Sequence, residues 1–197
     1  VVAEHIDTRW RFRQQAIPKI CDLISMVVRQ KPGKYLVFFS SYQFMSQVYE
    51  AYVKGFSSAS SLMMQQKGAS EEERADFLES FEKNQAVSLG FVIIGGIFAE
   101  GIDYVGDRLI GAIIIGPGLP QPDLKTRLLT EKFEGMYQAG FDYAYRYPAN
   151  TRVLQSAGRV IRSESDKGVV ILADRRFSTP DYLSLFPPHW QPWIVSN

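Results

Sequence analysis

The chain has 197 residues, of which 46% are hydrophobic and 22% charged, and its formal net charge is +1. This length suffices for one well-buried domain, and the balanced charge excludes a basic surface over the whole molecule, so any contact with nucleic acid must come from a local patch. Cys21 is the only cysteine, which excludes an internal disulfide and a cysteine-rich metal site within the chain and favours a reducing, cytoplasmic setting.

No apolar run approaches the roughly 20 residues that a membrane-spanning helix needs, so we expect no membrane partner. The chain begins at Val1 without an initiator methionine or a signal peptide. We therefore expect residues 1–197 to be a single domain excised from a longer protein.

The spacing of apolar residues predicts the elements in chain order. The first half is expected to contain a helix over 10–30, a strand over 35–39, a helix over 42–53, a strand over 57–64 and a helix that is capped at Ser70 and ends at Lys83. The second half is expected to contain strands over 87–94, 112–115 and 168–174, a helix over 123–139, and a helix that is capped by Asn150 or Thr151 after a turn at 148–151. The tail after residue 174 is expected to be a short helix and irregular chain.

Strands that are almost continuously apolar and alternate with helices predict an α/β domain with a mainly parallel central sheet and helices on both faces. Ligands bind such sheets beyond the carboxyl ends of the strands. Three notable segments follow predicted strands: Ser40-Ser41, residues 95–103, and residues 174–176.

Gln155, Arg159 and Arg162 have the spacing i, i+4 and i+7, which places them on one face of a predicted helix. Arginine binds oxyanions through two nitrogens and stays charged, so this face suits a polyphosphate. The alternative is an ordinary solvated face with two surface arginines. Val160 and Ile161 point elsewhere and are expected to be buried.

Residues 95–103 combine three glycines with two carboxylates directly after a buried strand. Glycines allow a backbone to approach a ligand closely and to present N–H donors, and Asp103 could accept hydrogen bonds from ribose hydroxyls. The alternative is a tight turn in which Glu100 and Asp103 only cap a helix.

Two common nucleotide-binding signatures are absent from the 197 residues. There is no phosphate loop of the form G-x-x-x-x-G-K-[ST], and no Asp-Glu pair follows a strand to hold Mg²⁺. His5 and His189 stand alone and are read as non-catalytic. If a nucleotide binds here, the chain supplies only half of its site.

Four ordered segments resemble motifs of one helicase family. Residues 155–162 resemble the Q-x-x-G-R-x-I-R form of helicase motif VI, and residues 96–103 resemble motif V with its Glu-Gly-Ile-Asp core. Residues 35–42 are similar to motif IV, and residues 172–177 resemble the closing D-x-R-F of the same domain. The set resembles the DinG/XPD-like branch of superfamily 2 DNA helicases, and within it the C-terminal, second RecA-like domain.

The resemblance implies a RecA-like, P-loop NTPase-type fold in three layers, with a helical insertion over 120–150. It implies that ATP binds in a cleft between this domain and an N-terminal RecA-like domain of the same parent chain. That N-terminal domain would hold most of the ATP and its Mg²⁺, and in many members of the family it carries an iron–sulfur cluster. No metal-binding residue is expected in the present chain.

Roles for individual residues also follow from the resemblance. Arg159 and Arg162 would be arginine fingers, with Gln155 sensing the nucleotide. The ATP-binding residues would be Glu100, Gly101 and Asp103, and single-stranded DNA would be held at its phosphates by Ser40, Ser41, Gly95 and Gly96. Phe98 and Tyr42 are candidates for stacking with bases, although an aromatic residue beside a glycine turn is more often part of the core.

The sequence thus predicts the second motor domain of an ATP-dependent DNA helicase, with 5′-to-3′ polarity by resemblance and a role in DNA repair or replication. An alternative is a nucleotide-dependent binding module that has a helicase fold but does not unwind DNA. A Rossmann-type nucleotide enzyme is disfavoured because no G-x-G-x-x-G follows a first strand.

Overall fold

A computed structural model describes residues 1–56, 61–83, 87–96, 109–160 and 167–196. The strands are β1 Val2–Ala3, β2 Lys34–Phe39, β3 Ser61–Met64, β4 Ser88–Ile93, β5 Gly111–Ile115, β6 Val169–Ala173 and β7 Ile194–Val195. The α-helices are α1 Arg13–Gln30, α2 Tyr42–Phe56, α3 Glu71–Lys83, α4 Leu124–Tyr137, α5 Tyr147–Ala157 and α6 Pro180–Leu183. Short 3₁₀ helices form at η1 Trp10–Phe12 and η3 Arg175–Ser178, and a π-helix forms at η2 Asp142–Arg146.

Within the described residues, seven strands form one parallel sheet in the order β3-β4-β2-β5-β6-β1-β7. β2 lies in the interior of the sheet between β4 and β5, where Phe39 is level with Ile93 of β4 and with Ile115 of β5. Tyr35 to Phe39 are fully buried, as expected for a strand that is covered on both faces. The predicted α/β class and parallel sheet are confirmed.

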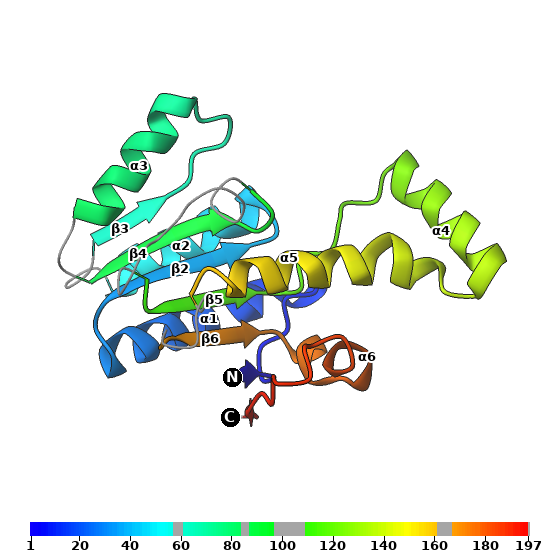
Figure 1. The fold of residues 1–197 in the computed structure, drawn as a ribbon. Coiled ribbons are helices and arrows are strands. Elements are labelled where there is room, and N and C mark those ends of the chain that lie inside the picture. The colour runs from blue at the N-terminus through cyan, green and yellow to red at the C-terminus, as the bar shows by residue number, and fades with distance from the viewer. Residues whose placement is uncertain (57–60, 84–86, 97–108, 161–166, 197) are drawn as a thin grey trace.

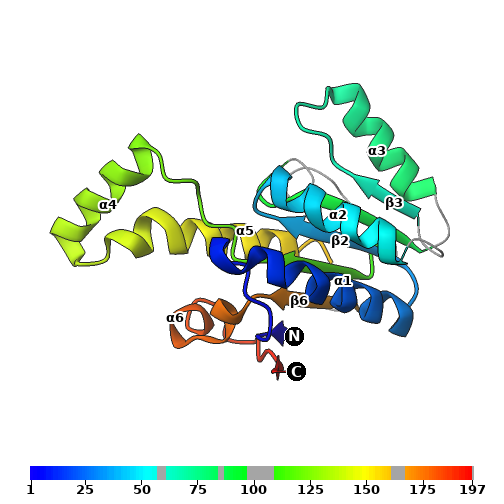
Figure 2. The same ribbon diagram turned by 180° about the vertical axis from the view of Figure 1, so that it is seen from behind.

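Helices cover both faces of the sheet, and alternate residues of β2 point into two separate cores. Tyr35, Val37 and Phe39 pack with apolar residues of α1 and α2 in one core. Leu36 and Phe38 belong to the other, which also includes residues of α3, α5 and the C-terminal segment. Figure 1 shows α5 in front of the sheet, and Figure 2 shows α1 and α2 over the opposite face.

The two chain ends lie side by side at one edge of the sheet, where β7 is the outermost strand, as both views show. β1 lies between β6 and β7, so Val2 is level with both Leu172 and Ile194. The sequence analysis missed both of these strands. Each has two residues, which is too short for a period of two to be recognised.

Caps define the starts of two predicted helices. At α3, the N–H of Ser70 donates to Glu73 Oε2 over 2.7 Å, and the N–H of Glu73 donates to Ser70 Oγ over 3.2 Å. At α4, Asp123 accepts from the N–H of Thr126 over 2.7 Å, and its own N–H donates to Thr126 Oγ1 over 2.8 Å. These reciprocal pairs are capping boxes, and they confirm the predicted start of each helix.

The helix α4 projects away from the sheet (Figure 1) and packs chiefly against η2. The ring of Phe133 stacks on that of Tyr143, with 4.4 Å between their centres, and Tyr137 stacks on Tyr143 at 5.6 Å. These aromatic rings therefore pack against one another where α4 meets η2, although Tyr137 and Tyr143 remain exposed.

The turn predicted at residues 148–151 is wrong, because these residues lie inside α5. Pro148 occupies the first turn of this helix, where a backbone N–H has no partner within the helix, so the N–H that proline lacks costs no hydrogen bond. Asn150 and Thr151 therefore cap nothing: the Asn150 side chain donates to the carbonyl of Leu185 over 3.1 Å, and Thr151 Oγ1 donates to that of Tyr147 over 3.1 Å.

Candidate functional site

The turns after β2 and β4 emerge side by side at the carboxyl edge of the sheet. The N–H of Ile94 donates to the carbonyl of Phe39 over 2.9 Å, which extends the pairing of the two strands by one residue. Ser40 and Ser41 therefore lie next to Gly95 and Gly96, and all four are half-buried. Ser41 Oγ accepts from the N–H of Phe44 over 3.3 Å at the start of α2. The structure thus brings together the four residues that the resemblance assigns to DNA.

Gly95 is needed at this edge because its φ is +70°, a conformation that residues with a Cβ rarely adopt. A Cβ there would also lie 2.9 Å from Cδ of Arg152 and 3.1 Å from its Nε. Arg152 belongs to α5 and lies one turn before Gln155. Sequence reasoning missed it, although a third cationic or polar residue at helical spacing was a usable signal.

Gln65 connects the end of β4 to the start of α2. Its Oε1 accepts from the N–H of Ile93 over 2.9 Å, and its Nε2 donates to the hydroxyl of Tyr42 over 3.1 Å. Gln65 is buried and Tyr42 half-buried, so the Tyr42 side chain helps to hold the edge together. No sequence pattern marked Gln65, because its two partners come from distant segments.

The helix predicted to carry Gln155, Arg159 and Arg162 is shorter than expected, since α5 ends at Ala157. The N–H groups of Arg159 and Val160 donate to the carbonyls of Ser156 and Ala157, which makes a tighter turn after the helix. Gln155 is exposed, Arg159 half-buried and Val160 buried, as predicted for Val160. Arg162 and Ile161 lie outside the described residues, as do Glu100, Gly101, Asp103 and Phe98.

The two groups of candidate residues lie near opposite ends of the strands. A Cβ on Gly168, at the start of β6, would meet Val160 Cγ1 and would lie 3.1 Å from the carbonyl oxygen of Ile110, just before β5. The turn that contains Arg159 is therefore close to the amino ends of these strands. Arg152, at the other end of the exposed face of α5, lies at the carboxyl edge beside Gly95.

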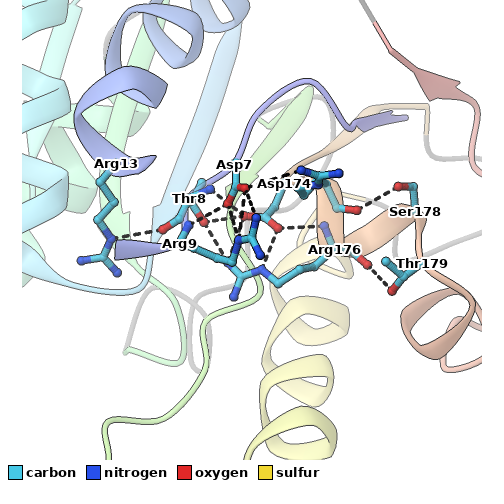
Figure 3. Close-up of polar contacts among 9 residues, drawn as sticks. Asp7, Thr8, Arg9, Arg13, Asp174, Arg176, Ser178 and Thr179 are labelled. Atoms are coloured by element: carbon cyan, nitrogen blue, oxygen red, sulfur yellow. Dashed lines mark hydrogen bonds and ion pairs between the residues drawn. The ribbon is translucent and has the colours of Figure 1, made fainter. Parts of the chain in front are cut away.

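Asp174, directly after β6, accepts five hydrogen bonds from Thr8 and Arg176 (Figure 3). It is fully buried and accepts from the N–H and Oγ1 of Thr8, over 2.9 and 2.6 Å. It also accepts from the N–H, Nε and Nη2 of Arg176, over 2.8, 2.7 and 2.9 Å. The segment before α1 is thereby fixed to the carboxyl edge.

The pKa of Asp174 reflects two opposed effects. Burial raises it, but the hydrogen bonds and positive charge of Arg176 and the hydrogen bond from Thr8 outweigh burial, so the pKa lies below its ordinary value. Asp174 is therefore an ionised structural group that orients the Arg176 guanidinium.

Among the described residues, no group of three or more His, Cys, Asp or Glu side chains is arranged to hold a metal ion. None of the described helices is long and apolar enough to cross a membrane.

The sheet is parallel, is covered by helices on both faces and has Ser and Gly turns at its carboxyl edge, while Gln155 lies on a covering helix and Arg159 in the turn after it. These features define a RecA-like α/β domain. Solved structures have the same fold. The TM-score is 0.72 against an XPD helicase, at 20% identity over 93% of this chain and 32% of that one. It is 0.58 against domain 2 of the DEAD-box helicase Mss116p, at 14% identity over 88% of this chain and 53% of that one.

Residues 24–193 match the family described as the helicase C-terminal domain. The chain belongs to this family, in the DinG/XPD-like branch of superfamily 2 helicases.

Three curated relatives illustrate the similarity. The chain is 30% identical over 169 residues to the 3′-5′ exonuclease DinG of Bacillus subtilis, covering 83% of this chain and 17% of that protein. It is 27% identical over 202 residues to regulator of telomere elongation helicase 1 of Bos taurus, covering 93% of this chain and 16% of that protein. It is 33% identical over 110 residues to the XPD helicase subunit of general transcription and DNA repair factor IIH of Arabidopsis thaliana. That match covers 54% of this chain and 14% of that protein. The matched segments span no more than 17% of these relatives.

Proposed function

We propose that this chain is the second motor domain of an ATP-dependent DNA helicase that acts in DNA repair or replication with 5′-to-3′ polarity. It would lend positive charge to ATP and form part of a groove for single-stranded DNA. One observation carries the proposal: Ser40, Ser41, Gly95 and Gly96 lie together at the carboxyl edge, whereas Arg159 lies near the other end of the strands. This separation is consistent with one surface for DNA and another for the nucleotide.

The ATP would bind chiefly to an N-terminal RecA-like domain of the same longer protein, because the 197 residues contain no phosphate loop. That domain would also hold Mg²⁺ and any iron–sulfur cluster. Arg159 and Arg162 would reach the γ-phosphate as arginine fingers, with Gln155 sensing the nucleotide, and Glu100, Gly101 and Asp103 would contact its ribose side. The proposal includes the cytoplasmic setting that the single cysteine favours.

At the DNA surface, backbone N–H groups near Gly95 and Gly96 and the side chains of Ser40 and Ser41 would contact phosphates. Such contacts hold a strand without reading its sequence. The conformation of this edge is held on two sides, because Gln65 accepts from the N–H of Ile93 and the Arg152 side chain lies against Gly95.

The arginine fingers give the first prediction. In the longer protein, Arg159→Ala or Arg162→Ala should lower kcat for ATP hydrolysis by about 10³–10⁵-fold, because each guanidinium meets charge that develops on the transferred phosphoryl group. ATP affinity should change little, because the other domain supplies most of the contacts. Steady-state hydrolysis and equilibrium binding of a fluorescent ATP analogue measure the two effects.

Arg127→Ala is the matched control, since Arg127 is an exposed arginine of α4 whose only described ion pair is with Glu131 of the same helix. It should leave kcat unchanged. A finger variant with the kcat of the unmodified protein would remove that residue from the proposed mechanism.

A second candidate function is a nucleotide-dependent nucleic-acid-binding module that does not unwind DNA. It is favoured by the name of the Bacillus subtilis relative, 3′-5′ exonuclease DinG, which mentions a nuclease activity and no unwinding. A strand-displacement assay separates the two functions: ATP hydrolysis and DNA binding without displacement would favour the module.

A further inference from the structure

A hollow of about 540 Å³ lies at the carboxyl edge beyond β2, β5 and β6. Its volume is within the range of about 300–1,000 Å³ that is usual for ligand sites. Five parts of the chain form its walls: residues 8–13 before α1, Ser40 after β2, the loop over 116–122, Phe141 and Tyr145 at η2, and Arg176 of η3.

The walls carry three guanidinium groups, two of which are neutralised by carboxylates. Arg9 donates to Asp7 through Nε and Nη2, and Arg176 is held by Asp174. Arg13 also lines the hollow, and it has no carboxylate partner among the described residues: its Nε donates to the carbonyl of Thr8 over 3.2 Å. The hollow therefore carries excess positive charge.

The surroundings of Arg13 favour an anion. Burial and, secondarily, the positive charge of Arg176 lower the pKa of Arg13, although an arginine remains charged at neutral pH. A phosphate group beside Arg13 would compensate its charge and could accept charge-assisted hydrogen bonds from its guanidinium. Ser40 lines the same hollow and adds a hydroxyl donor.

An aromatic surface lies beside this charge. The indole of Trp10 is 73% exposed, and Cζ of Arg13 lies 5.4 Å from its ring centre and 5.0 Å from that of Phe44. The rings of Phe141 and Tyr145 stack at 5.3 Å and also line the hollow. Proteins that bind single strands combine a positive groove with aromatic rings on which bases stack.

The hollow continues the edge that is proposed for DNA. Along the sheet order, the turns after β4, β2, β5 and β6 carry Gly95, Ser40, Gly116 and Arg176. Ser40 belongs to both the proposed phosphate contacts and the hollow. Single-stranded DNA that crosses this edge in the direction from β4 to β6 would meet the hollow directly after Ser40.

We infer that this hollow binds one nucleotide of single-stranded DNA, with Arg13 and Ser40 at its phosphate and Trp10 stacked on its base. Arg176 is held by Asp174 and donates through Nη2 to Thr8 Oγ1 over 3.0 Å, so it helps to hold the segment that carries Trp10 and Arg13. The inference rests on the proposed function and adds a contact that lies outside the four motif-like segments.

Binding of a fluorescein-labelled oligothymidine to the longer protein, followed by anisotropy at increasing KCl concentration, tests the inference. Arg13→Gln should weaken binding about tenfold and reduce the salt slope by about 0.7, the value for one lost phosphate contact with a single strand. Trp10→Ala should weaken binding by about 5- to 150-fold and leave the salt slope unchanged. An oligomer of abasic deoxyribose phosphate should lose affinity with Arg13→Gln but not with Trp10→Ala.

Arg11→Gln and Trp193→Ala are matched controls, since both residues are exposed and neither lines the hollow. Both should bind oligothymidine like the unmodified protein. Melting temperatures of all four variants establish that they are folded, and Arg13→Lys, which keeps the charge, should restore the salt slope.

Folded Arg13→Gln and Trp10→Ala variants with unchanged affinity and slope would overturn this inference, while oligothymidine binding by the unmodified protein would leave the proposed function standing. If Trp10→Ala weakened binding of the abasic oligomer equally, the stacking role would be refuted. If the unmodified protein bound no oligothymidine, the proposed function itself would fail.

Discussion

Asp174 shows how one residue links the two ends of the chain at the carboxyl edge. Its oxygens accept from Thr8, 166 residues away in sequence, and from Arg176. A buried carboxylate that loses its charge leaves its cationic partner poorly compensated. The position of residues 8–13, and with it the proposed nucleotide site, depends on this one group.

Asp174→Asn should therefore lower the free energy of unfolding of this chain by about 3 kcal/mol, because it removes one partner of a buried ion pair. Urea denaturation followed by circular dichroism measures the change. Asp181→Asn is a suitable control, since that carboxylate is 62% exposed in its pair with Arg146 and should contribute at most about 1 kcal/mol. Equal effects of the two substitutions would contradict the structural role of Asp174.

The same residue predicts how stability depends on pH. Its pKa is lower in the folded chain than its ordinary value, so its contribution is complete above the pKa of the unfolded state and is lost as pH falls through the folded value. The free energy of unfolding should thus fall steadily below about pH 4. In Asp174→Asn this fall should be shallower, and parallel curves for the two proteins would disprove the assignment.

At the scale of elements, the loop after β5 has a shape that only glycine permits. Gly116 and Gly118 have φ of +77° and +67°, and the N–H of Gly116 donates to the carbonyl of Ala173 over 3.2 Å. A Cβ on Gly116 would lie 2.5 Å from Oγ1 of Thr8. The turn therefore joins β5, β6 and the segment before α1 in one tight arrangement, which forms a wall of the hollow.

Gly116→Ala should destabilise the chain by about 1–2 kcal/mol from the left-handed backbone, and by more if Thr8 cannot move. Gly135→Ala provides the opposite case, because Gly135 lies inside the exposed helix α4 with no atom within 4 Å of an added Cβ. It should stabilise the chain by up to about 1 kcal/mol. Thermal unfolding of both variants checks the pair, and a stabilising Gly116→Ala would contradict the described turn.

At the scale of the whole molecule, the candidate site residues are divided between the two ends of the strands. The carboxyl edge gathers Ser40, Gly95, Arg13 and Arg176, while the turn with Arg159 lies towards the other end. Under the proposed function, this domain supplies only part of the nucleotide site, and the N-terminal RecA-like domain of the longer protein supplies the rest.

The isolated chain should accordingly hydrolyse ATP negligibly, with or without oligothymidine, because the 197 residues contain no phosphate loop. Measurement of phosphate release from the chain, and from the longer protein as the positive control, tests this expectation. Strong DNA-stimulated hydrolysis by the chain would show that the nucleotide site is complete within it.

Most of the elements could be predicted because their signals are local. The continuous apolar run Tyr35–Phe39 identified the central strand, and the capping residues Ser70 and Asp123 marked two helix starts. The exceptions have local causes as well. Pro148 is compatible with both a turn and the first turn of a helix, and the two-residue strands β1 and β7 are too short to show a pattern.

The sequence by itself determined the α/β class, the parallel sheet, the family and the grouping of Ser40 with Gly95, because these depend on periodicity, on motif order and on the meeting of strand ends at one edge. Only the tertiary structure decided that Gln65 and Arg152 brace that edge, that α5 ends before Arg159, and that Asp174 brings Arg13 and Trp10 to Ser40. Those features depend on contacts between residues far apart in sequence. Such contacts form when the packed layers fix which segments meet, and they leave no periodic trace in the chain.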